Sequence, residues 1–359
     1  MKLNWSTLTG PTVLVNRTRA KRNIESMKAK AEAAQVQLRP HFKTHQSTII
    51  GKWFGTPETT PIAVSSLKMA NEFASAGWRD IHIAIPVNPR ELPALNNLAS
   101  KVNLTLSIEH EDTLELLSHL SHKVAVSVEV DTGYGRTGIH WQQYGRIKRL
   151  LDALQAHKQV NQLGLMVHSG HSYLAHGLKD IQGVHQESSH RLKELLDMMD
   201  WQGEPLRVSI GDTPTCSQMS TFPGATEIRP GNYVFYDLQQ KLIGSCDWND
   251  IALAVACPVI ARYPEREEVV VHGGAVHFSK DSAEMNGQKV FGQVMHTTEN
   301  GWGAPVGDAY IKGLSQEHGK IHLPKTMIKD LKLGDMLVIV PAHSCLTMSA
   351  MGEFICFDD

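Results

Sequence analysis

Short apolar segments alternate with helix-like segments over the first two thirds of the chain. Between most of the apolar segments, apolar residues recur at helical spacing, for example over 68–76, 141–156 and 189–199. Eight apolar segments end in polar or glycine-rich residues, as buried parallel strands do; they are 36–42, 62–65, 81–87, 104–108, 124–130, 163–168, 206–210 and 226–232. The pattern predicts a (β/α)8 TIM barrel, an α/β fold, with an open doubly wound sheet as the alternative.

The pattern changes after about residue 246. Five β-like segments follow without long helices between them and predict an all-β C-terminal domain: 255–260, 268–272, 276–278, 290–294 and 336–340. A further strand at 12–15 is surplus to the barrel, so we expect it to pair with the β domain. The predicted domains are a barrel over 16–245 and a β domain made of 246–359 together with 1–15.

Composition and charge exclude several classes of partner. Lys and Arg number 35 against 37 Asp and Glu, a formal charge of -2, and no basic cluster points to nucleic acid or to an anionic membrane surface. The sequence shows neither an apolar stretch of spanning length nor a secretory signal. Five scattered cysteines without a C-x-x-C pair indicate a reducing compartment, and we expect a cytoplasmic protein.

Polar clusters follow five of the predicted strands, at the ends where barrel enzymes build their active sites. They occupy 39–45, 131–138, 168–173, 211–215 and 229–233. The last two clusters follow strands seven and eight, the usual position of a phosphate site in such barrels. Their small residues offer backbone N–H groups and hydroxyls to an anion, although the same residues also form ordinary turns.

Lys43 lies one residue beyond the first predicted strand, among His41, Thr44 and His45. We expect its amine to point into the barrel mouth, where burial and nearby cations favour the neutral form that condenses with a carbonyl. The alternative is a solvated surface lysine.

His343 and Cys345 form an H-x-C pair after the last predicted strand. In an extended segment, residues i and i+2 point to the same face, so the two side chains can share one ion. Imidazole and thiolate together suit zinc. The alternative is a buried histidine beside a buried small cysteine.

The motifs together resemble the D-threonine aldolase and eukaryotic-type D-serine dehydratase family, which are fold-type III pyridoxal-phosphate (PLP) enzymes related to alanine racemase. The resemblance runs in order through 39–45, 131–138, 168–173, 213–215, 229–237 and 341–347. It implies that Lys43 holds PLP as a Schiff base and carries the proton at Cα. It places Arg136 near the phenolic oxygen of the cofactor and Tyr173 near the ring or the substrate. The implied phosphate-binding residues are Thr213, Gly231, Asn232 and Tyr233.

The resemblance also identifies His343 and Cys345 with the pair that binds a divalent metal, zinc in the dehydratases, with Mn²⁺ as the alternative. The expected activity is a metal-assisted lyase reaction on a small D-β-hydroxy amino acid. Elimination from a D-serine-like substrate and retro-aldol cleavage of a D-threonine-like substrate both stay open, and the cysteine favours elimination. For the retro-aldol route, His45 and His171 are candidate bases.

Three other functions are compatible with the motifs. They are an amino acid racemase of the alanine racemase type, a PLP-binding protein without turnover, and a metal-dependent sugar-phosphate barrel without PLP. A racemase needs a second base, for which the β domain offers Tyr263 and Tyr310. The resemblance further implies a homodimer.

Overall fold

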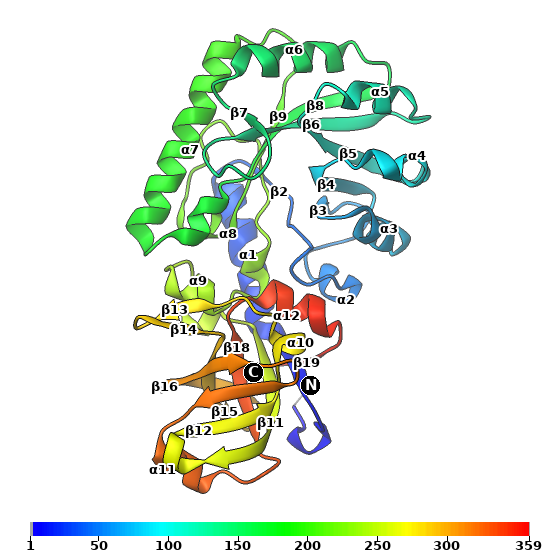
Figure 1. The fold of residues 1–359 in the computed structure, drawn as a ribbon. Coiled ribbons are helices and arrows are strands. Elements are labelled where there is room, and N and C mark those ends of the chain that lie inside the picture. Colours follow the sequence, from blue (N-terminus) through cyan, green and yellow to red (C-terminus); the bar gives the residue numbers. More distant parts are fainter. Residues whose placement is uncertain (1–2, 359) are drawn as a thin grey trace. The chain divides into compact units, whose positions relative to one another are not determined.

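The computed structural model describes residues 3–358 and divides into two compact units (Figure 1). The barrel unit comprises residues 26–231, and the sheet unit comprises residues 1–25 together with 232–359. Among the described residues, none of the helices has both the length and the apolar character needed to cross a membrane.

Eight parallel strands form the barrel unit, and all eight predicted segments are confirmed. Each strand pairs with the next, β10 pairs back to β2, and a bridge between His41 and Ala63 joins the segment after β2 to β3. The ring therefore closes, which decides between a barrel and an open sheet. The strands are β2 (Gln37–Leu38), β3 (Ile62–Val64), β4 (Asp80–Pro86), β5 (Asn103–Ile108), β6 (Val124–Asp131), β8 (Val160–Val167), β9 (Arg207–Ile210) and β10 (Glu227–Ile228), with β7 (Ile139–His140) attached to β6.

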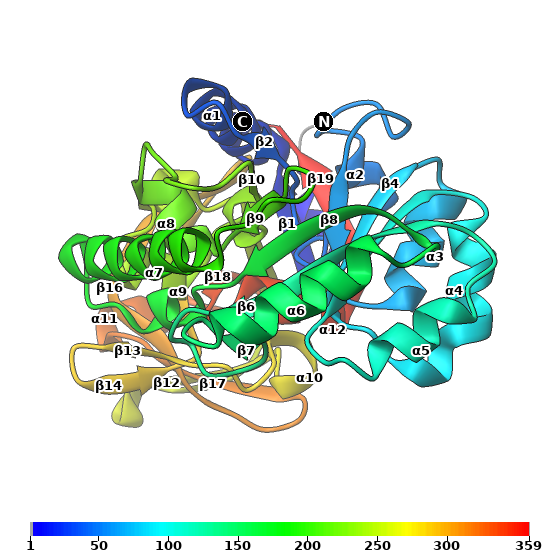
Figure 2. The ribbon, with the colours of Figure 1, turned by 90° about the horizontal axis from the view of Figure 1, so that it is seen from above.

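Helices follow most of the barrel strands and lie outside them in the view from above (Figure 2). The helix α6 shows the sequence logic, because its recurring apolar residues are its buried face: Ile147, Leu150, Leu151 and Leu154. The longest helix, α7, begins at Leu178, well before the predicted start at 189. The buried face of its first half includes the polar residues His185 and Ser188, so apolar spacing does not show this half in the sequence. The helices are α1 (Arg17–Ala33), α2 (Thr48–Gly51), α3 (Leu67–Ser75), α4 (Leu92–Ala99), α5 (Thr113–Ser118), α6 (Tyr144–Gln155), α7 (Leu178–Met199) and α8 (Thr213–Gln218).

A buried ion pair fastens the closure of the barrel. Arg39, fully buried just after β2, places Nε 2.7 Å from Oε2 of Glu227 on β10. Its Nη1 lies 2.6 Å from Oδ1 of Asp80 on β4. The guanidinium therefore joins the first and last strands of the ring through charge-assisted hydrogen bonds.

The sheet unit is built on a mainly antiparallel sheet in the order β12-β17-β16-β15-β18-β11-β1-β19, in which β12 also pairs with β11. The predicted pairing of the early strand is confirmed: β1 lies antiparallel to β11 and parallel to β19. The strands are β1 (Thr12–Asn16), β11 (Leu253–Tyr263), β12 (Glu268–His272), β15 (Gly292–Thr298), β16 (Gly301–Leu314), β17 (His318–His322), β18 (Met336–Pro341) and β19 (Phe354–Phe357), beside a hairpin of β13 (Ala283–Met285) and β14 (Gln288–Val290).

Two local predictions for this unit are wrong. The segment 276–278 is not a strand but part of the short helix α10 (Ala275–Phe278), whose first residues donate to backbone carbonyls of Ser315 and Gln316. The segment after β18 is not extended either: α12 (Ser344–Met351) begins directly after His343. Both segments are too short for apolar spacing to distinguish strand from helix. The remaining helices are α9 (Leu238–Leu242) and α11 (Lys325–Asp330).

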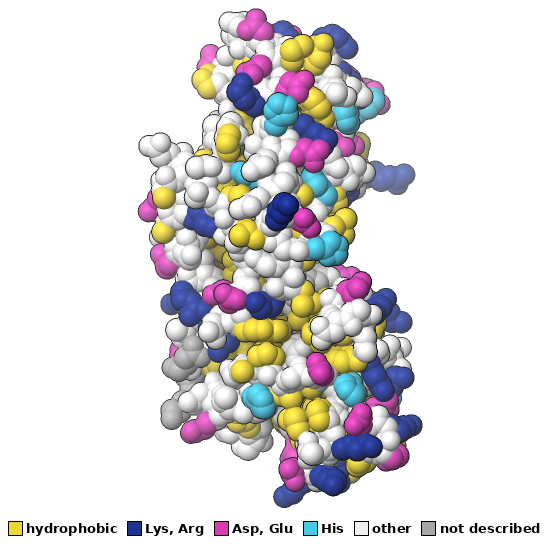
Figure 3. All heavy atoms as spheres, turned by 90° about the vertical axis from the view of Figure 1, so that its left-hand side faces the viewer, with side chains coloured by type: hydrophobic (Ala, Val, Ile, Leu, Met, Phe, Trp, Pro, Cys, Tyr) yellow, Lys and Arg dark blue, Asp and Glu magenta, His cyan; other side chains and the backbone are white. Residues whose placement is uncertain are grey.

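On the face drawn in Figure 3, cationic and anionic side chains are interspersed. This distribution agrees with the near-neutral formal charge of the chain.

Candidate active site

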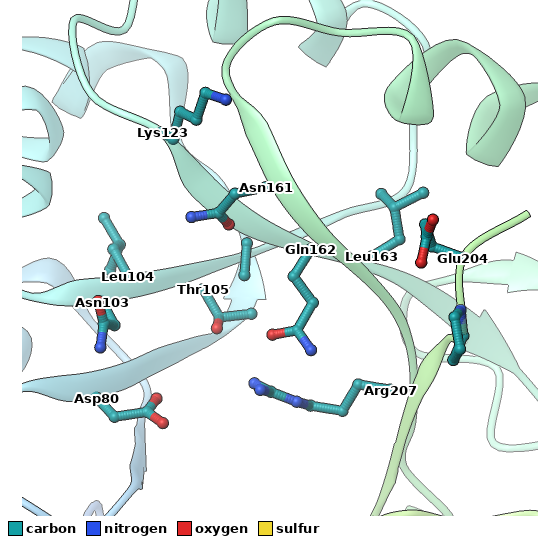
Figure 4. Close-up of a pocket in the computed structure, with 12 residues that line it drawn as sticks. Asp80, Asn103, Leu104, Thr105, Lys123, Asn161, Gln162, Leu163, Glu204 and Arg207 are labelled. Atoms are coloured by element: carbon teal, nitrogen blue, oxygen red, sulfur yellow. The ribbon is translucent and has the colours of Figure 1, made fainter.

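The predicted polar clusters lie at the carboxyl ends of the barrel strands. The opposite end carries a hollow of a different kind, with a volume of about 630 Å³ (Figure 4). Asp80, Asn103 and Arg207, which begin their strands, line it together with Lys123. Because barrel enzymes place their chemistry at the carboxyl ends, we locate the candidate site at the end that holds Lys43.

Lys43 lies in the turn after β2, among histidines that are held neutral. Its backbone N–H donates to Nδ1 of His41, at 3.3 Å. Burial, together with the positive charges of Lys43 and Arg229, holds the pKa of His41 well below its usual value. Burial also lowers the pKa of His168 to about 3, and the charge of Lys43 contributes. His41 and His168 are therefore neutral beside the half-buried Lys43.

His168 has a defined tautomer. Its Nδ1 lies 2.6 Å from the backbone carbonyl of Gly211, which can only accept a hydrogen bond. Nδ1 therefore carries the proton, and Nε2 keeps its lone pair. The charges that act on His168 come from Lys43, Arg136 and Arg229, so these three cations share one end of the barrel with it.

The backbone conformation of the loop 131–138 explains the spacing of its glycines. Oδ1 of Asp131 accepts hydrogen bonds from the backbone N–H groups of residues 133, 134 and 135, at 2.8, 2.8 and 3.1 Å. Gly133 and Gly135 have φ of +130° and +75°, which side chains disfavour. The loop presents Arg136, whose guanidinium carbon lies 5.4 Å from the ring centre of Tyr134.

His171 lies in a 3-10 helix, Gly170–Leu174, and stacks on the ring of Tyr134, with centroids 6.3 Å apart. Both of its ring nitrogens are buried and have no hydrogen-bond partner among the described residues. Burial lowers its pKa. The structure therefore brings His171 to the loop that carries Arg136.

His45 has different surroundings. It is buried against Phe42, Phe54 and Phe73, with ring centroids 4.4, 5.5 and 6.1 Å away. Its Nδ1 accepts the backbone N–H of Ser47, and burial lowers its pKa to about 3. This predicted base thus lies in an aromatic cluster, and within the described part of the chain no hydrogen bond or ring contact joins it to His41 or His168.

The loops after β9 and β10 are organised as tight turns. The buried Asp212 accepts hydrogen bonds from the Thr215 backbone N–H and hydroxyl and from the Ser172 hydroxyl, at 2.7–2.8 Å, and burial raises its pKa to about 6. The next residue, Thr213, donates its backbone N–H to the hydroxyl of Tyr173 at 3.1 Å. The structure therefore places Tyr173 at the predicted phosphate loop.

Close backbone approach requires glycine in both of the predicted phosphate loops. A Cβ at Gly211 would lie 2.9 Å from backbone atoms of Arg229, and one at Gly231 would lie 2.9 Å from the carbonyl of His41. Small residues, buried polar groups and neutral histidines around a lysine fit an anionic aldehyde cofactor. The orphaned nitrogens of His171 indicate that a polar ligand belongs in this part of the barrel.

In the sheet unit, His343 and Cys345 lie together although their segment is not extended. His343 is the N-cap of α12, and Cys345 is in the first turn of that helix. The two side chains are hydrogen-bonded to each other, and Nδ1 of His343 lies 2.6 Å from Oδ2 of Asp281. Burial disfavours the charged imidazole, but Cys345, Asp237 and Asp281 outweigh it and raise the pKa of His343 to about 10. A sulfur and an imidazole oriented by a carboxylate fit a divalent metal.

Asn232 and Tyr233, the remaining predicted phosphate ligands, begin the sheet unit and are both buried. Nδ2 of Asn232 donates to Oδ2 of Asp237 at 2.7 Å and lies 3.5 Å from Sγ of Cys345. Asp237 also accepts the backbone N–H of Ser344, which fixes the start of α12. The side chain of Asn232 thus contacts the surroundings of the H-x-C pair, and its role as a phosphate ligand stays a prediction.

Sequence reasoning gave no role to three acids: Asp237 and Asp281, which lie around the H-x-C pair of the sheet unit, and Glu129, which is buried on β6 of the barrel unit. Asp237 lies inside the motif 229–237, and Glu129 lies two residues before the motif 131–138. Their closeness to these motifs could have identified both acids from the sequence. Asp281 lies in a loop without a pattern, and only the fold brings it to His343.

Two family descriptions match the chain: "Alanine racemase, N-terminal domain" over residues 15–239 and "Putative serine dehydratase domain" over 252–357. The D-serine dehydratase of Dictyostelium discoideum is 29% identical over 381 residues, covering 97% of this chain and 93% of that protein. The D-threonine aldolase of Arthrobacter sp. is 23% identical over 345 residues, covering 93% and 85%.

A solved structure, D-threo-3-hydroxyaspartate dehydratase from Delftia sp. HT23, superposes with a TM-score of 0.87 at 27% identity, covering 98% of this chain and 95% of that chain. Solved structures of D-threo-3-hydroxyaspartate dehydratase also include a cysteine-to-alanine variant in a metal-free form and a histidine-to-alanine variant. The replaced residues are two positions apart, the spacing of His343 and Cys345. On this evidence, the chain belongs to the D-threonine aldolase and eukaryotic-type D-serine dehydratase family of fold-type III PLP enzymes.

Proposed function

We propose that this protein is a PLP-dependent, metal-assisted dehydratase of small D-β-hydroxy amino acids. The observation that carries the proposal is the hydrogen-bonded pair of His343 and Cys345 with Asp281 behind the imidazole. Racemisation only moves the proton at Cα, so a racemase has no use for a Lewis acid at Cβ. Loss of a hydroxyl from Cβ does gain from one.

The barrel residues have distinct roles in this proposal. PLP, when bound, supplies the electron sink for the bond that breaks at Cα. Lys43 holds the cofactor through its amine and carries the proton at Cα. Arg136 binds the phenolic oxygen, and Thr213 and Gly231 bind the phosphate through the turns described above, together with Asn232 and Tyr233.

We assign zinc rather than manganese as the metal. A divalent metal supplies Lewis-acid assistance to the departure of the β-hydroxyl. Cys345 offers a soft sulfur ligand, which zinc accepts and which manganese, with its preference for oxygen ligands, does not favour. Two protein ligands leave coordination positions for water and substrate.

Retro-aldol cleavage of a D-threonine-like substrate is the second candidate, because His171 offers a base. Its unpartnered, half-buried imidazole could take the proton of a β-hydroxyl. The cysteine of the metal pair and the higher identity to dehydratases, 26–29% against 23% for the aldolase, favour elimination.

The deciding experiment identifies products. The protein, loaded with PLP and zinc, is incubated with D-serine, D-threonine and D-3-hydroxyaspartate, with the L-enantiomers as controls. Ammonia with an oxo acid such as pyruvate supports elimination, whereas glycine with an aldehyde establishes retro-aldol cleavage. Rapid interconversion of the alanine enantiomers would overturn the lyase proposal. Full activity after complete removal of metal would overturn the role of His343 and Cys345.

A further inference from the structure

A group of metal-ligating side chains in the sheet unit has no part in the proposed reaction. Within residues 3–358, it is the one place where three His, Cys, Asp or Glu side chains each bring a ligand atom to within 4.8 Å of the others. The three are His272 at the end of β12, His277 in α10, and Glu317, which directly precedes β17. All three belong to the sheet unit, so the group lies within one compact body.

The distances in this group are close to those that a small cation imposes. A tetrahedral ion with nitrogen and oxygen ligands at about 2.1 Å holds those ligands about 3.4 Å apart. Nε2 of His272 already lies 3.6 Å from Oε2 of Glu317. The ring centre of His277 lies 5.4 Å from that of His272. Small rotations of the side chains are therefore enough to bring all three onto one ion.

The backbone that carries these side chains is fixed by the close approach of α10 to the turn 315–317. Backbone N–H groups at the start of α10 donate to carbonyls of this turn, at 2.8–3.2 Å, and one of these bonds joins Gly273 to Glu317 itself. A Cβ at Gly274 would clash with the carbonyl of Gln316, so glycine is needed for this approach. The backbone of the ligands is thus in position before a cation arrives, which lowers the conformational entropy lost on binding.

The protonation state of His277 also suits a cation. Burial lowers the pKa of His277, although the carboxylate of Glu317 opposes the shift. The neutral imidazole is the form that binds metals. Its Nδ1 accepts the backbone N–H of Gly274 at 3.1 Å. A neutral ring has one nitrogen lone pair, so coordination by either ring nitrogen replaces this single hydrogen bond.

We propose that His272, His277 and Glu317 form a divalent metal site, separate from the H-x-C pair, which takes a zinc-class ion and cross-links α10 to the end of β12 and to the turn before β17. Two imidazoles and a carboxylate are a ligand set that zinc accepts, with one position left for water. Magnesium and calcium prefer oxygen ligands throughout. The alternative is a simple ion pair between His272 and Glu317, whose side chains are 43% and 48% exposed and whose pairing would contribute little.

The test measures zinc in Cys345→Ser, which lacks a proposed ligand of the H-x-C pair. The full-length, metal-stripped protein is loaded with zinc, desalted and analysed for metal, and competition with a chromophoric chelator gives the affinity. We expect Cys345→Ser to keep one zinc ion per chain in the presence of excess magnesium. Adding His277→Gln, which retains an acceptor for the Gly274 N–H, should lower the affinity by more than about 100-fold, beyond the effect of a residue that only orients a ligand.

The matched control is His296→Gln, which replaces an exposed histidine of β15 in the same unit. Added to Cys345→Ser, it should leave the zinc affinity unchanged. Zinc should also raise the melting temperature of Cys345→Ser, because the ion binds the folded chain, and should not raise that of the variant that also carries His277→Gln.

The outcomes separate this inference from the proposed function. Loss of all zinc from Cys345→Ser on desalting, or equal affinity after His277→Gln, overturns the inference and leaves the dehydratase proposal intact. Zinc that is lost in His277→Gln but kept in full by Cys345→Ser supports the inference and removes the metal from the H-x-C pair. If His277→Gln does not fold, Glu317→Gln changes a half-exposed side chain and should also lower the affinity; an unchanged affinity there overturns the inference.

Discussion

Nδ1 of His343 lies 2.6 Å from Oδ2 of Asp281, so the carboxylate accepts the Nδ1 proton and fixes the orientation of the imidazole. The other ring nitrogen is then directed away from Asp281, and in the proposed metal site it and Sγ of Cys345 are the two protein ligands. An outer carboxylate that orients a ligating histidine is a common feature of metal sites.

Replacement of Asp281 is expected to weaken metal binding. Asp281→Asn removes the negative charge behind His343, and the affinity for zinc should fall by about 10- to 100-fold. Competition with a chromophoric chelator measures the affinity. Glu284→Gln, in an exposed acid of β13, is the control. Equal affinities of Asp281→Asn and wild type would mean that the hydrogen bond plays no part in metal binding.

Replacement of Cys345 is expected to separate the metal from the cofactor. Cys345→Ser exchanges a soft sulfur for a hydroxyl, so zinc affinity at this pair and the rate of ammonia release from D-serine should both fall. The loss should exceed the roughly 100-fold upper bound expected for Asp281→Asn, which changes a residue that only orients a ligand. The absorbance of bound PLP should persist, since Lys43, the proposed cofactor lysine, is elsewhere in the chain. Cys356→Ser, in β19, should behave as wild type. If Cys345→Ser kept its zinc and its activity, the sulfur of Cys345 would not be a metal ligand.

Lys43 is expected to be the point of cofactor attachment. Borohydride reduction of the PLP-loaded protein should fix a pyridoxyl group on the peptide that contains Lys43, as read by mass spectrometry. Lys43→Ala should give no adduct, and Lys52→Ala should give the wild-type adduct. An adduct on any other lysine contradicts the assignment.

His45 is expected to affect stability in acid rather than catalysis. Its folded pKa of about 3 lies below the ordinary value of 6.5, so the unfolded chain takes up the proton first and stability is lost as pH falls from 6.5 towards 3. His45→Asn keeps an acceptor for the Ser47 N–H without the titration. Between pH 6.5 and pH 5 it should lose about 2 kcal/mol less of its unfolding free energy than wild type. Urea unfolding at each pH measures this, with the exposed His122→Asn as control; parallel pH curves for His45→Asn and wild type would refute it.

The ion pair of Arg39 is expected to be essential to the barrel. Glu227→Gln leaves the buried guanidinium with only part of its counter-charge and should reduce the unfolding free energy by about 3–5 kcal/mol. Chemical denaturation measures the loss. The exposed Glu115→Gln should change little, and equal losses in the two variants would contradict the role assigned to the pair.

The barrel could be predicted from the sequence because its strands are apolar and its motifs follow them directly. The H-x-C pair was found for the same reason, as a motif next to β18. The helical backbone of this pair was not predicted. Helix α12 begins where the Ser344 N–H donates to Asp237, a residue that lies more than a hundred positions earlier. Asp281 was missed because its role depends on a contact over 62 positions. Long-range polar contacts leave no periodicity in the chain.

Strand β1 has both of its neighbours, β11 and β19, on the far side of the entire barrel sequence. During synthesis, residues 12–16 are made before the barrel, yet their first partner, β11, follows only after the barrel sequence, and their second partner, β19, follows later still. The barrel can collapse while this apolar strand is still exposed. Chaperone demand and premature termination should therefore affect the sheet unit most, since a chain that stops short of residue 354 leaves one edge of β1 permanently open.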